Sequence, residues 1–155
     1  MNIEIRKGTK ADIPSALNLV KELAVYEKAP NEVEVTIEEM TEWGFGIDKQ
    51  FDFYVALLDG IIVGMALYYF KYSTWKGKCL FLEDIIVTES QRRKGFGKLL
   101  FDKVVQVSKE MKVRRMEWQV LDWNMPSIEF YKKYNSILDG EWVNCKLTNH
   151  QLEKM

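Results

Sequence analysis

The first half of the chain alternates between segments whose apolar residues recur with the period of a strand and segments with the period of a helix. Ile3 and Ile5 alternate with charged residues, which predicts a half-buried strand. A capping box at Thr9 and Asp12 follows. Beyond it, apolar residues recur at helical spacing, which predicts a helix that runs to about Glu27. The apolar positions of this helix are Ile13, Leu17, Val20 and Ala24.

A short helix and a pair of strands are predicted next. Thr36-Ile37-Glu38-Glu39 is a second capping box and marks the start of the helix. Phe51 to Leu58 and Ile61 to Lys71 are each predicted to form a strand, with Asp59-Gly60 as the turn of a hairpin. A glycine inside a strand, here Gly64, indicates a bulge or a close approach of another backbone.

A strand, a helix and another strand are predicted in the following segment. The run from Lys78 to Val87 is apolar except for Glu83 and Asp84, and Arg114 to Val120 is the second strand. At this spacing the two strands should be parallel and joined by a right-handed crossover. The helix between them has its apolar stripe at Phe96, Leu100, Val104, Val107 and Met111.

The last segment contains a second short helix. Pro126 suits the first turn of a helix that we expect to end near Tyr134, with Asn135 as a left-handed cap. Trp142 to Leu147 is predicted to close the chain as a strand. An antiparallel front half joined to a βαβ unit predicts an α+β (mixed α/β) fold whose twisted central sheet is mixed and mostly antiparallel.

Composition narrows the class of protein. A chain of 155 residues with 47% hydrophobic residues suits one globular domain, which we predict to span residues 1–155. The net charge of -1 argues against binding to nucleic acid. The longest apolar run, Ile61 to Phe70, is too short to span a membrane. Cys79 and Cys145 lack a CxxC spacing and are expected to be reduced thiols, so we expect a cytoplasmic protein.

A basic stretch with two glycines lies between the predicted strand and helix of the βαβ unit: Arg92-Arg93-Lys94-Gly95-Phe96-Gly97-Lys98. The first N–H groups of a helix lack intrahelical acceptors, and the helix dipole adds positive charge there. Glycines without a Cβ let a ligand approach the backbone closely. The stretch therefore predicts a phosphate or pyrophosphate site. The alternative is a basic surface turn that caps an ordinary helix.

Several other kinds of site are excluded by the residues present. Leu99 follows Lys98 where a P-loop needs Ser or Thr, and Leu100 replaces the third glycine of the dinucleotide fingerprint. The single histidine, His150, lies in a polar C-terminal segment, which argues against a Ser-His-Asp catalytic triad or a Cys-His catalytic dyad. A His/Cys metal site lacks ligands, so we expect no metal.

Carboxylates and tyrosines are the remaining candidates for chemistry. Glu83 and Asp84 interrupt an apolar strand, where they could accept a proton or bind a cationic substrate, or simply be satisfied at a bulge. Tyr131 is either a packed aromatic residue or a catalytic one. Tyr26-Glu27 ends the first predicted helix, where the alternative is a solvated helix end.

Together these motifs resemble the diamine acetyltransferases of the GNAT superfamily, which include the spermidine/spermine and thialysine acetyltransferases. The basic stretch resembles the acetyl-CoA-binding loop of that superfamily. The other similar segments are Lys21-Glu22-Leu23-Ala24 with Tyr26-Glu27, Gly44-Phe45-Gly46, Tyr68-Tyr69-Phe70 with Tyr72 and Trp75, Leu82-Glu83-Asp84, and Trp123-Asn124 with Pro126-Ser127 and Phe130-Tyr131. Trp75-Lys76-Gly77 and Val120-Leu121-Asp122-Trp123-Asn124 are similar to the thialysine branch.

The resemblance implies a set of residues that bind acetyl-CoA. The backbone from Ile85 through Ile86 to Val87 would pair with the pantetheine arm in a cleft between splayed strands, and the residues from Arg92 to Lys98 would hold the pyrophosphate. The thioester would lie between Asn124 and Tyr131. The complete set of implied cofactor-binding residues is Ile85, Ile86, Val87, Arg92, Arg93, Lys94, Gly95, Phe96, Gly97, Lys98, Asn124, Pro126, Ser127 and Tyr131.

The resemblance also implies catalytic and substrate-binding roles. Tyr131 would be the general acid for the departing coenzyme A thiolate, and Glu83 would help to remove the amine proton, through water. The amine pocket would be lined by Tyr26, Glu27, Glu83, Glu117, Trp118 and Gln119. Two positions depart from the usual glycines of the group, namely Arg93 and Asn135.

These roles imply an acetyl-CoA-dependent N-acetyltransferase that acts on the primary amine of a small cationic substrate by direct transfer in a ternary complex. The substrate would be a diamine, a polyamine or a thialysine-like amine. Alternatives are an N-acetyltransferase for an amino acid or a protein, or a non-catalytic regulatory module that binds acyl-CoA. The resemblance further implies a homodimer.

Overall fold

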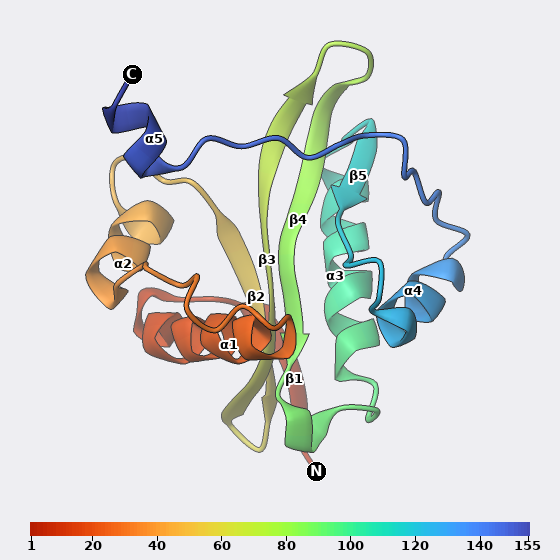
Figure 1. Ribbon diagram of the computed structural model, residues 1–155. Coiled ribbons are helices and arrows are strands. Elements are labelled where there is room, and N and C mark those ends of the chain that lie inside the picture. Colours follow the sequence, from red (N-terminus) through yellow and green to blue (C-terminus); the bar gives the residue numbers. More distant parts are fainter. The chain divides into compact units, whose positions relative to one another are not determined.

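The computed structural model describes residues 1–155, which form two compact units, Met1–Gln119 and Val120–Met155. The larger unit contains the whole sheet (Figure 1). Its five strands lie in the order β1-β2-β3-β4-β5. All neighbouring strands are antiparallel except β4 and β5, which are parallel, so the predicted mixed sheet is confirmed. The strands are β1 (Ile3–Lys7), β2 (Asp52–Leu58), β3 (Ile61–Ser73), β4 (Gly77–Val87) and β5 (Arg115–Trp118).

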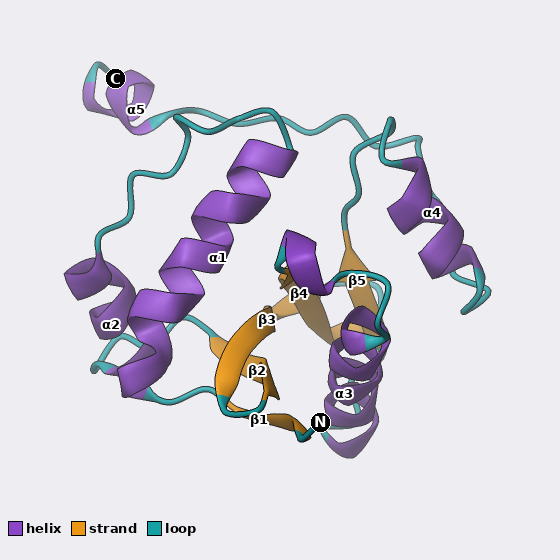
Figure 2. Cartoon of the chain, turned by 90° about the horizontal axis from the view of Figure 1, so that it is seen from below, coloured by secondary structure: helices purple, strands orange, loops and turns teal.

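Helices cover both faces of this sheet. Helices α1 (Ile13–Tyr26) and α2 (Ile37–Phe45) lie on one face, and α3 (Phe96–Glu110) lies on the other (Figures 1 and 2). Because α3 connects β4 to the parallel strand β5, these elements form the predicted βαβ unit. Two single turns of 3-10 helix, Lys10–Asp12 and Glu89–Gln91, precede α1 and follow β4.

Both predicted capping boxes are present: the box at Thr9 begins the 3-10 turn that leads into α1, and the box at Thr36 begins α2. The Asp12 carboxylate accepts hydrogen bonds from the Thr9 N–H at 2.8 Å and from the Arg6 guanidinium at 2.7 Å. The bond from Arg6 is the main reason why the pKa of Asp12 is lowered to about 2. At α2, the Thr36 hydroxyl accepts from the Glu39 N–H at 3.1 Å. Local polar contacts therefore begin each helix where the sequence indicates.

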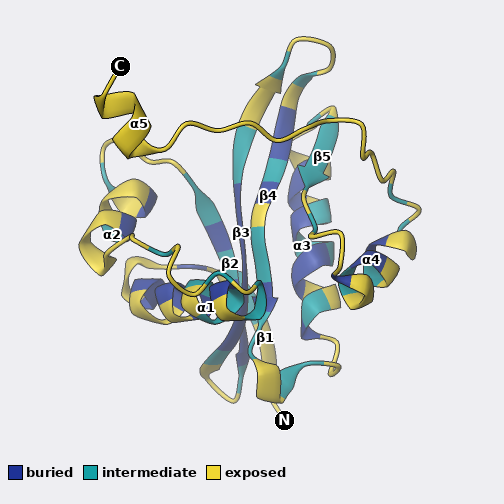
Figure 3. Cartoon of the chain, viewed as in Figure 1, coloured by how far each residue is buried: buried dark blue, intermediate teal, exposed yellow.

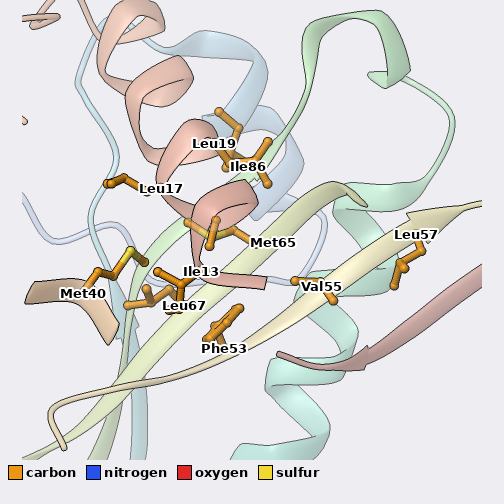
Figure 4. Packing of buried hydrophobic residues seen from close by; sticks show 11 residues of the cluster. Ile13, Leu17, Leu19, Met40, Phe53, Val55, Leu57, Met65, Leu67 and Ile86 are labelled. Atoms are coloured by element: carbon orange, nitrogen blue, oxygen red, sulfur yellow. The ribbon is translucent and has the colours of Figure 1, made fainter. Parts of the chain in front are cut away.

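The main hydrophobic core lies between α1, α2 and the sheet (Figure 4). Ile13, Val55 and Met65 come from α1, β2 and β3, and their side chains are fully buried. Burial of each such side chain contributes about 1.5–3 kcal/mol to folding. The buried residues of the core are Ile13, Ala16, Leu17, Leu19, Met40, Phe53, Val55, Leu57, Met65, Leu67 and Ile86.

The hairpin of β2 and β3 combines a tight turn with an irregular register. Asp59 and Gly60 both have positive φ angles, 49° and 81°, as the predicted two-residue turn requires. Gly64 pairs with Ala56 whereas Ile62 pairs with Leu57, so one residue of β3 is left over beside Gly64. A Cβ at Gly64 would lie only 2.8 Å from the Ile86 carbonyl oxygen. The predicted bulge and the predicted close approach therefore both occur.

The smaller unit contains two short helices, α4 (Met125–Lys132) and α5 (Asn149–Glu153). The predicted strand at Trp142 to Leu147 is wrong, because residues 136–148 pair with no other strand. An alternating pattern makes a two-faced segment, but a strand also needs a neighbour to receive its backbone hydrogen bonds. Figure 3 shows this segment as largely exposed. Asn135 has a φ of 55°, which confirms the predicted left-handed cap.

Candidate active site

A β-bulge in β4 places two consecutive carboxylates on the same face of the sheet. Asp84 pairs with Leu67 and Leu82 pairs with Tyr68, so Glu83 is the extra residue. Leu67 belongs to the core beneath α1, and its partner Asp84 lies on that face. The Tyr69 hydroxyl, two residues further along β3, donates to Glu83 Oε2 at 3.2 Å. The bulge that the sequence left open as an alternative is therefore present, and it is compatible with a chemical role for the two acids.

The end of α1 brings a third carboxylate to this pair, because Glu27 is the C-terminal cap of the helix. Burial, followed by the negative charges of Glu83 and Glu27, raises the pKa of Asp84 to about 6. Burial also raises the pKa of Glu27. Burial and the nearby Glu83 charge raise the pKa of Tyr69 to about 12. Within this carboxylate cluster, Asp84 is therefore partly buried beside the negative charges of Glu83 and Glu27, and a bound cation would stabilise its charged form.

Beyond the bulge, β4 loses its neighbour on one side. Strand β5 pairs only with the segment from Cys79 to Leu82. The predicted cofactor-binding residues Ile85, Ile86 and Val87 therefore pair with β3 alone. A backbone edge of this kind can receive hydrogen bonds from an extended ligand.

The basic loop between β4 and α3 has the backbone that its sequence predicts for an anion site. Gly95 is the N-cap of α3 with a φ of 90°, and no atom lies within 4 Å of the position that a Cβ would occupy. The first N–H groups of α3 begin directly after this open position. Lys94 donates to Gln91 Oε1, and Lys98 is paired with Asp102 along the helix. Loop and helix thus present accessible N–H groups that carry the partial positive charge of a helix N-terminus.

Arg92 is held differently from the other cations of the loop. Its Nε donates to the Val87 carbonyl oxygen at 2.9 Å. Its Cζ atom lies 4.9 Å from the centre of the Tyr26 ring, and its Nη2 lies 3.8 Å from Glu22 Oε1. The loop therefore contacts the last turn of α1, which also carries Glu27.

Comparison with known proteins identifies the family. Residues 17–135 match the acetyltransferase (GNAT) family. The chain belongs to the GNAT acetyltransferases. It is 36% identical over 156 residues to the thialysine N-ε-acetyltransferase of Bos taurus, and the match covers 92% of this chain and 90% of the bovine protein.

Two further similarities support the family and the fold. The spermidine/spermine N(1)-acetyltransferase-like protein 1 of Homo sapiens is 33% identical over 135 residues, which are 83% of this chain and 19% of the human protein. The crystal structure of an aminoglycoside acetyltransferase from an uncultured soil metagenomic sample superimposes with a TM-score of 0.77 at 20% sequence identity. That superposition covers 94% of this chain and 95% of the other, and it agrees with the α+β fold.

The basic loop of this GNAT domain adopts a backbone that explains one of its unusual residues. Arg93 has a φ of 63°, in the left-handed region that glycine occupies without strain. This is the position where the resemblance leads us to expect glycine. The arginine keeps the glycine-like backbone, and its side chain is exposed.

Strand β5 of the GNAT domain and the residue after it include three residues that were predicted to line the amine pocket. Glu117 lies 3.4 Å from Lys71 Nζ and 3.5 Å from Arg115 Nε, so its charge is already partly balanced. Trp118 packs edge-on against Phe101 of α3, with 5.2 Å between ring centres, and thus lies on the face opposite the carboxylate cluster. Gln119 follows the end of β5, which is shorter than the predicted strand.

Helix α4 of the smaller unit carries the remaining candidates. The buried Asn124 is the N-cap, and its side-chain oxygen accepts from the Ser127 N–H at 3.4 Å. Pro126 occupies the first turn, as predicted. Tyr131 is buried, and its ring meets Phe130 edge-on at 5.4 Å. Asn124, Pro126, Ser127 and Tyr131 are thus all supplied by one helix and its cap.

The sequence alone assigns no separate role to two residues that the structure singles out, Asp84 by its raised pKa and Glu22 by its hydrogen bonds. Asp84 is a candidate there only together with Glu83, yet its pKa is raised to about 6, mainly by burial. Glu22 is named there only as part of a segment that resembles the family. In the structure its carboxylate accepts hydrogen bonds from Thr88 and Glu89, which follow β4. The signal for Asp84 is its place beside Glu83 in an apolar strand. No pattern along the chain connects Glu22 with residues 66 and 67 positions away.

No metal site is apparent in the structure, where no group of three or more His, Cys, Asp or Glu side chains is arranged to hold an ion. No helix is long and apolar enough to cross a membrane.

Proposed function

We propose that this GNAT domain transfers an acetyl group from acetyl-CoA to the primary amine of a small cationic substrate, such as a thialysine-like amino acid, a diamine or a polyamine. The observation that carries the proposal is the cluster of Glu27, Glu83 and Asp84 beside the unpaired edge of β4. The thialysine acetyltransferase relative supports a small substrate with a side-chain amine.

The carboxylate cluster suits a cation. The charges of Glu83 and Glu27 act on the partly buried Asp84, so this cluster favours a ligand that carries one or more ammonium groups. Asp84, with a pKa of about 6, changes charge just below neutral pH, so the cluster can hold a proton or an ammonium group under mild conditions. Tyr69 keeps Glu83 in place through its hydroxyl hydrogen bond.

Acetyl-CoA supplies an activated acetyl thioester, and several elements of this chain suit its parts. The backbone of the loop from Arg92 to Lys98 and the start of α3 would bind the pyrophosphate. The edge of β4 from Ile85 through Ile86 to Val87 would bind the pantetheine arm. Asn124, Pro126 and Ser127 would contribute the N-terminal end of α4.

The reaction requires two proton transfers, one from the substrate ammonium group and one to the departing thiolate. A primary amine has a pKa near ~10.4, so formation of its neutral form at pH 7 costs roughly 4 to 5 kcal/mol. A carboxylate at Glu83 stabilises the ammonium form and must therefore also offer the proton a route away, through water. Tyr131 would donate a proton to the departing thiolate, because a tyrosine hydroxyl near pKa ~10 retains its proton until the thiolate forms. Direct transfer needs no covalent acyl-enzyme.

An amine panel tests the proposal. Purified protein would be incubated with acetyl-CoA and, in turn, thialysine, ornithine, putrescine, spermidine or a lysine-containing peptide, and free thiol would be measured. We expect thiol release that depends on a small amine and greatly exceeds release with the peptide. Selective acetylation of the peptide would instead favour a protein acetyltransferase. Tight coenzyme A binding without amine-dependent thiol release would favour the regulatory module and overturn catalysis.

A further inference from the structure

Glu22 connects the last turns of α1 with the residues that follow β4. Its two carboxylate oxygens accept hydrogen bonds from the Thr88 hydroxyl at 3.1 and 3.0 Å. Oε1 also accepts from the Glu89 N–H at 2.8 Å. Thr88 and Glu89 are the first residues after β4 and lead into the basic loop. One side chain of α1 therefore fixes the backbone from which the proposed phosphate loop begins.

Arg92 completes a closed set of contacts. It bonds the Val87 carbonyl oxygen, lies 3.8 Å from Glu22 and stacks over Tyr26. Glu22 and Tyr26 are four residues apart on α1 and so share one helix face. The contacts run from Glu22 to the end of β4, along the loop to Arg92, and back to α1 at Tyr26. The next residue after Tyr26 is Glu27 of the carboxylate cluster.

These contacts suit Arg92 to hold the loop against α1 rather than to bind phosphate directly. The Nε–H donor is used by Val87, one face of the guanidinium lies over Tyr26, and an edge faces Glu22. The planar guanidinium of Arg92 donates a hydrogen bond and lies over an aromatic ring at the same time. The compact ammonium group of lysine cannot replace both contacts. Hydrogen bonds to a charged acceptor, such as those of Glu22, are stronger than neutral ones.

We propose that Glu22 is a positioning residue that couples the phosphate loop to the amine-facing end of α1, acting through Thr88, Glu89 and Arg92. The inference rests on the proposed function of the site. Loss of the Glu22 carboxylate would free the start of the loop and the Tyr26 side of the amine pocket together. Because one carboxylate holds both the start of the loop and the arginine that lies over Tyr26, weaker cofactor binding and weaker amine binding should appear in the same variant.

The experiment compares Glu22→Ala, Glu22→Gln, Arg92→Lys and Arg92→Ala with the wild type. Asn18→Ala, an exposed position one turn earlier on α1, is the matched control. Calorimetry gives the Kd for coenzyme A, and steady-state kinetics at saturating acetyl-CoA give KM and kcat for an accepted amine. In Glu22→Ala we expect the Kd and the amine KM each to rise about 5- to 20-fold, with kcat changed less than about threefold, since the lost hydrogen bonds are charge-assisted.

The other variants separate positioning from simple charge. Glu22→Gln keeps an acceptor oxygen for the Glu89 N–H and should show a smaller rise in both constants. Arg92→Lys should behave like Glu22→Ala if the arginine acts through Val87 and Tyr26. If Arg92→Lys keeps the affinity of the wild type while Arg92→Ala loses it, the arginine is a phosphate ligand and the proposal is overturned.

Unfolding curves distinguish coupling from a structural role. A Glu22→Ala protein that is less stable but retains both Kd and KM within twofold would overturn the inference. Should Glu22→Ala fail to fold, Thr88→Ala removes the hydroxyl from the other side of the contact, and the same twofold limit applies to it. A wild type that binds coenzyme A but acetylates no amine would overturn only the proposed function, since the comparison of Kd values still decides the inference. A wild type that does not bind coenzyme A would overturn both.

Discussion

The hydroxyl group of Tyr131 gives the sharpest test of the proposed mechanism. Removal of this single oxygen in Tyr131→Phe keeps the ring that packs against Phe130. If the hydroxyl protonates the leaving thiolate, kcat should fall by about 10²- to 10⁴-fold. Affinity for acetyl-CoA should change little, because its phosphates would be bound elsewhere. Steady-state and single-turnover kinetics, together with a cofactor titration, measure the two effects separately.

Tyr134→Phe is the matched control, since its ring also packs edge-on against Phe130, at 5.5 Å. It should keep the wild-type rate. A Tyr131→Phe enzyme that retains more than half of the wild-type single-turnover rate would reject the general-acid role.

Asp84 should make folding stability depend on pH. Its pKa in the folded protein, about 6, lies above the ordinary value of 3.8, so the folded chain binds this proton more tightly than the unfolded chain does. The resulting stabilisation is fully present below about pH 4 and is lost as the pH rises through 6. Across this window the free energy of unfolding should fall by about 1.4 kcal/mol per pH unit.

Urea unfolding of the wild type and Asp84→Asn between pH 4 and 7 tests this expectation. The variant should lack this fall and be more stable than the wild type at pH 7 by about 3 kcal/mol, while its amine KM rises. Asp48→Asn, at an exposed position, should keep the wild-type slope. Equal slopes in wild type and Asp84→Asn would show that burial and the neighbouring charges do not raise the pKa of Asp84.

At the scale of single residues, the sequence is sufficient to select Glu83 and Asp84, because charges in an apolar strand are conspicuous. It cannot reveal that a bulge turns both side chains to the α1 face, since the register shift depends on the partner strand. The basic stretch also suggests a phosphate-binding role for Arg92. Its contacts with Glu22 and Tyr26 could not be foreseen, because they depend on a helix that lies far away along the chain.

Among the elements, the turn between β4 and α3 can be tested with a pair of glycines. Gly95 and Gly60 have φ angles of 90° and 81°, and at neither would a new Cβ meet an atom within 4 Å. Alanine at either position should therefore destabilise the fold by about 1–2 kcal/mol through backbone strain alone. Only Gly95→Ala should also weaken coenzyme A binding, by about tenfold, because only that turn orients the first N–H groups of α3.

Thermal unfolding and calorimetric titration of the two variants measure both effects. Gly60→Ala, in the β2–β3 turn, controls for the general consequence of lower stability. If the two variants bind coenzyme A equally well, the turn before α3 does not form the phosphate site.

The elements that the sequence predicts well are those whose signals are local. Capping boxes, the Asp59-Gly60 turn and the stripe of α3 from Phe96 to Val107 all depend on neighbours along the chain, whereas Met111, the last predicted member of that stripe, is exposed beyond the end of the helix. The predicted strand at Trp142 to Leu147 is wrong because alternation cannot supply a pairing partner. Helix α5 is not predicted, because its five residues are too few to show a periodic apolar stripe. Its capping box, formed by Thr148 and Gln151, is the one local signal for it.

For the molecule as a whole, the C-terminal segment exposes more apolar surface than a lone chain would be expected to carry. The side chains of Ile137, Trp142 and Val143 are 94%, 72% and 84% exposed. We predict a homodimer in which these side chains are covered by the second copy. Light scattering should give about twice the 18.3 kDa of one chain at micromolar concentration.

Replacement of Trp142 and Val143 together by serine should shift the assembly towards monomer. Ile47→Ser is the control, because Ile47 is fully exposed in the other unit and should leave the assembly unchanged. A wild-type mass of one chain at micromolar concentration would contradict the predicted dimer.

The two cysteines differ completely in accessibility, since Cys79 is buried in β4 and Cys145 is exposed between Trp142 and α5. A maleimide dye applied to the native protein should therefore react at Cys145 alone and mark the C-terminal segment without any engineered mutation. Mixing donor-labelled and acceptor-labelled chains would then turn energy transfer into a direct measure of how fast subunits exchange.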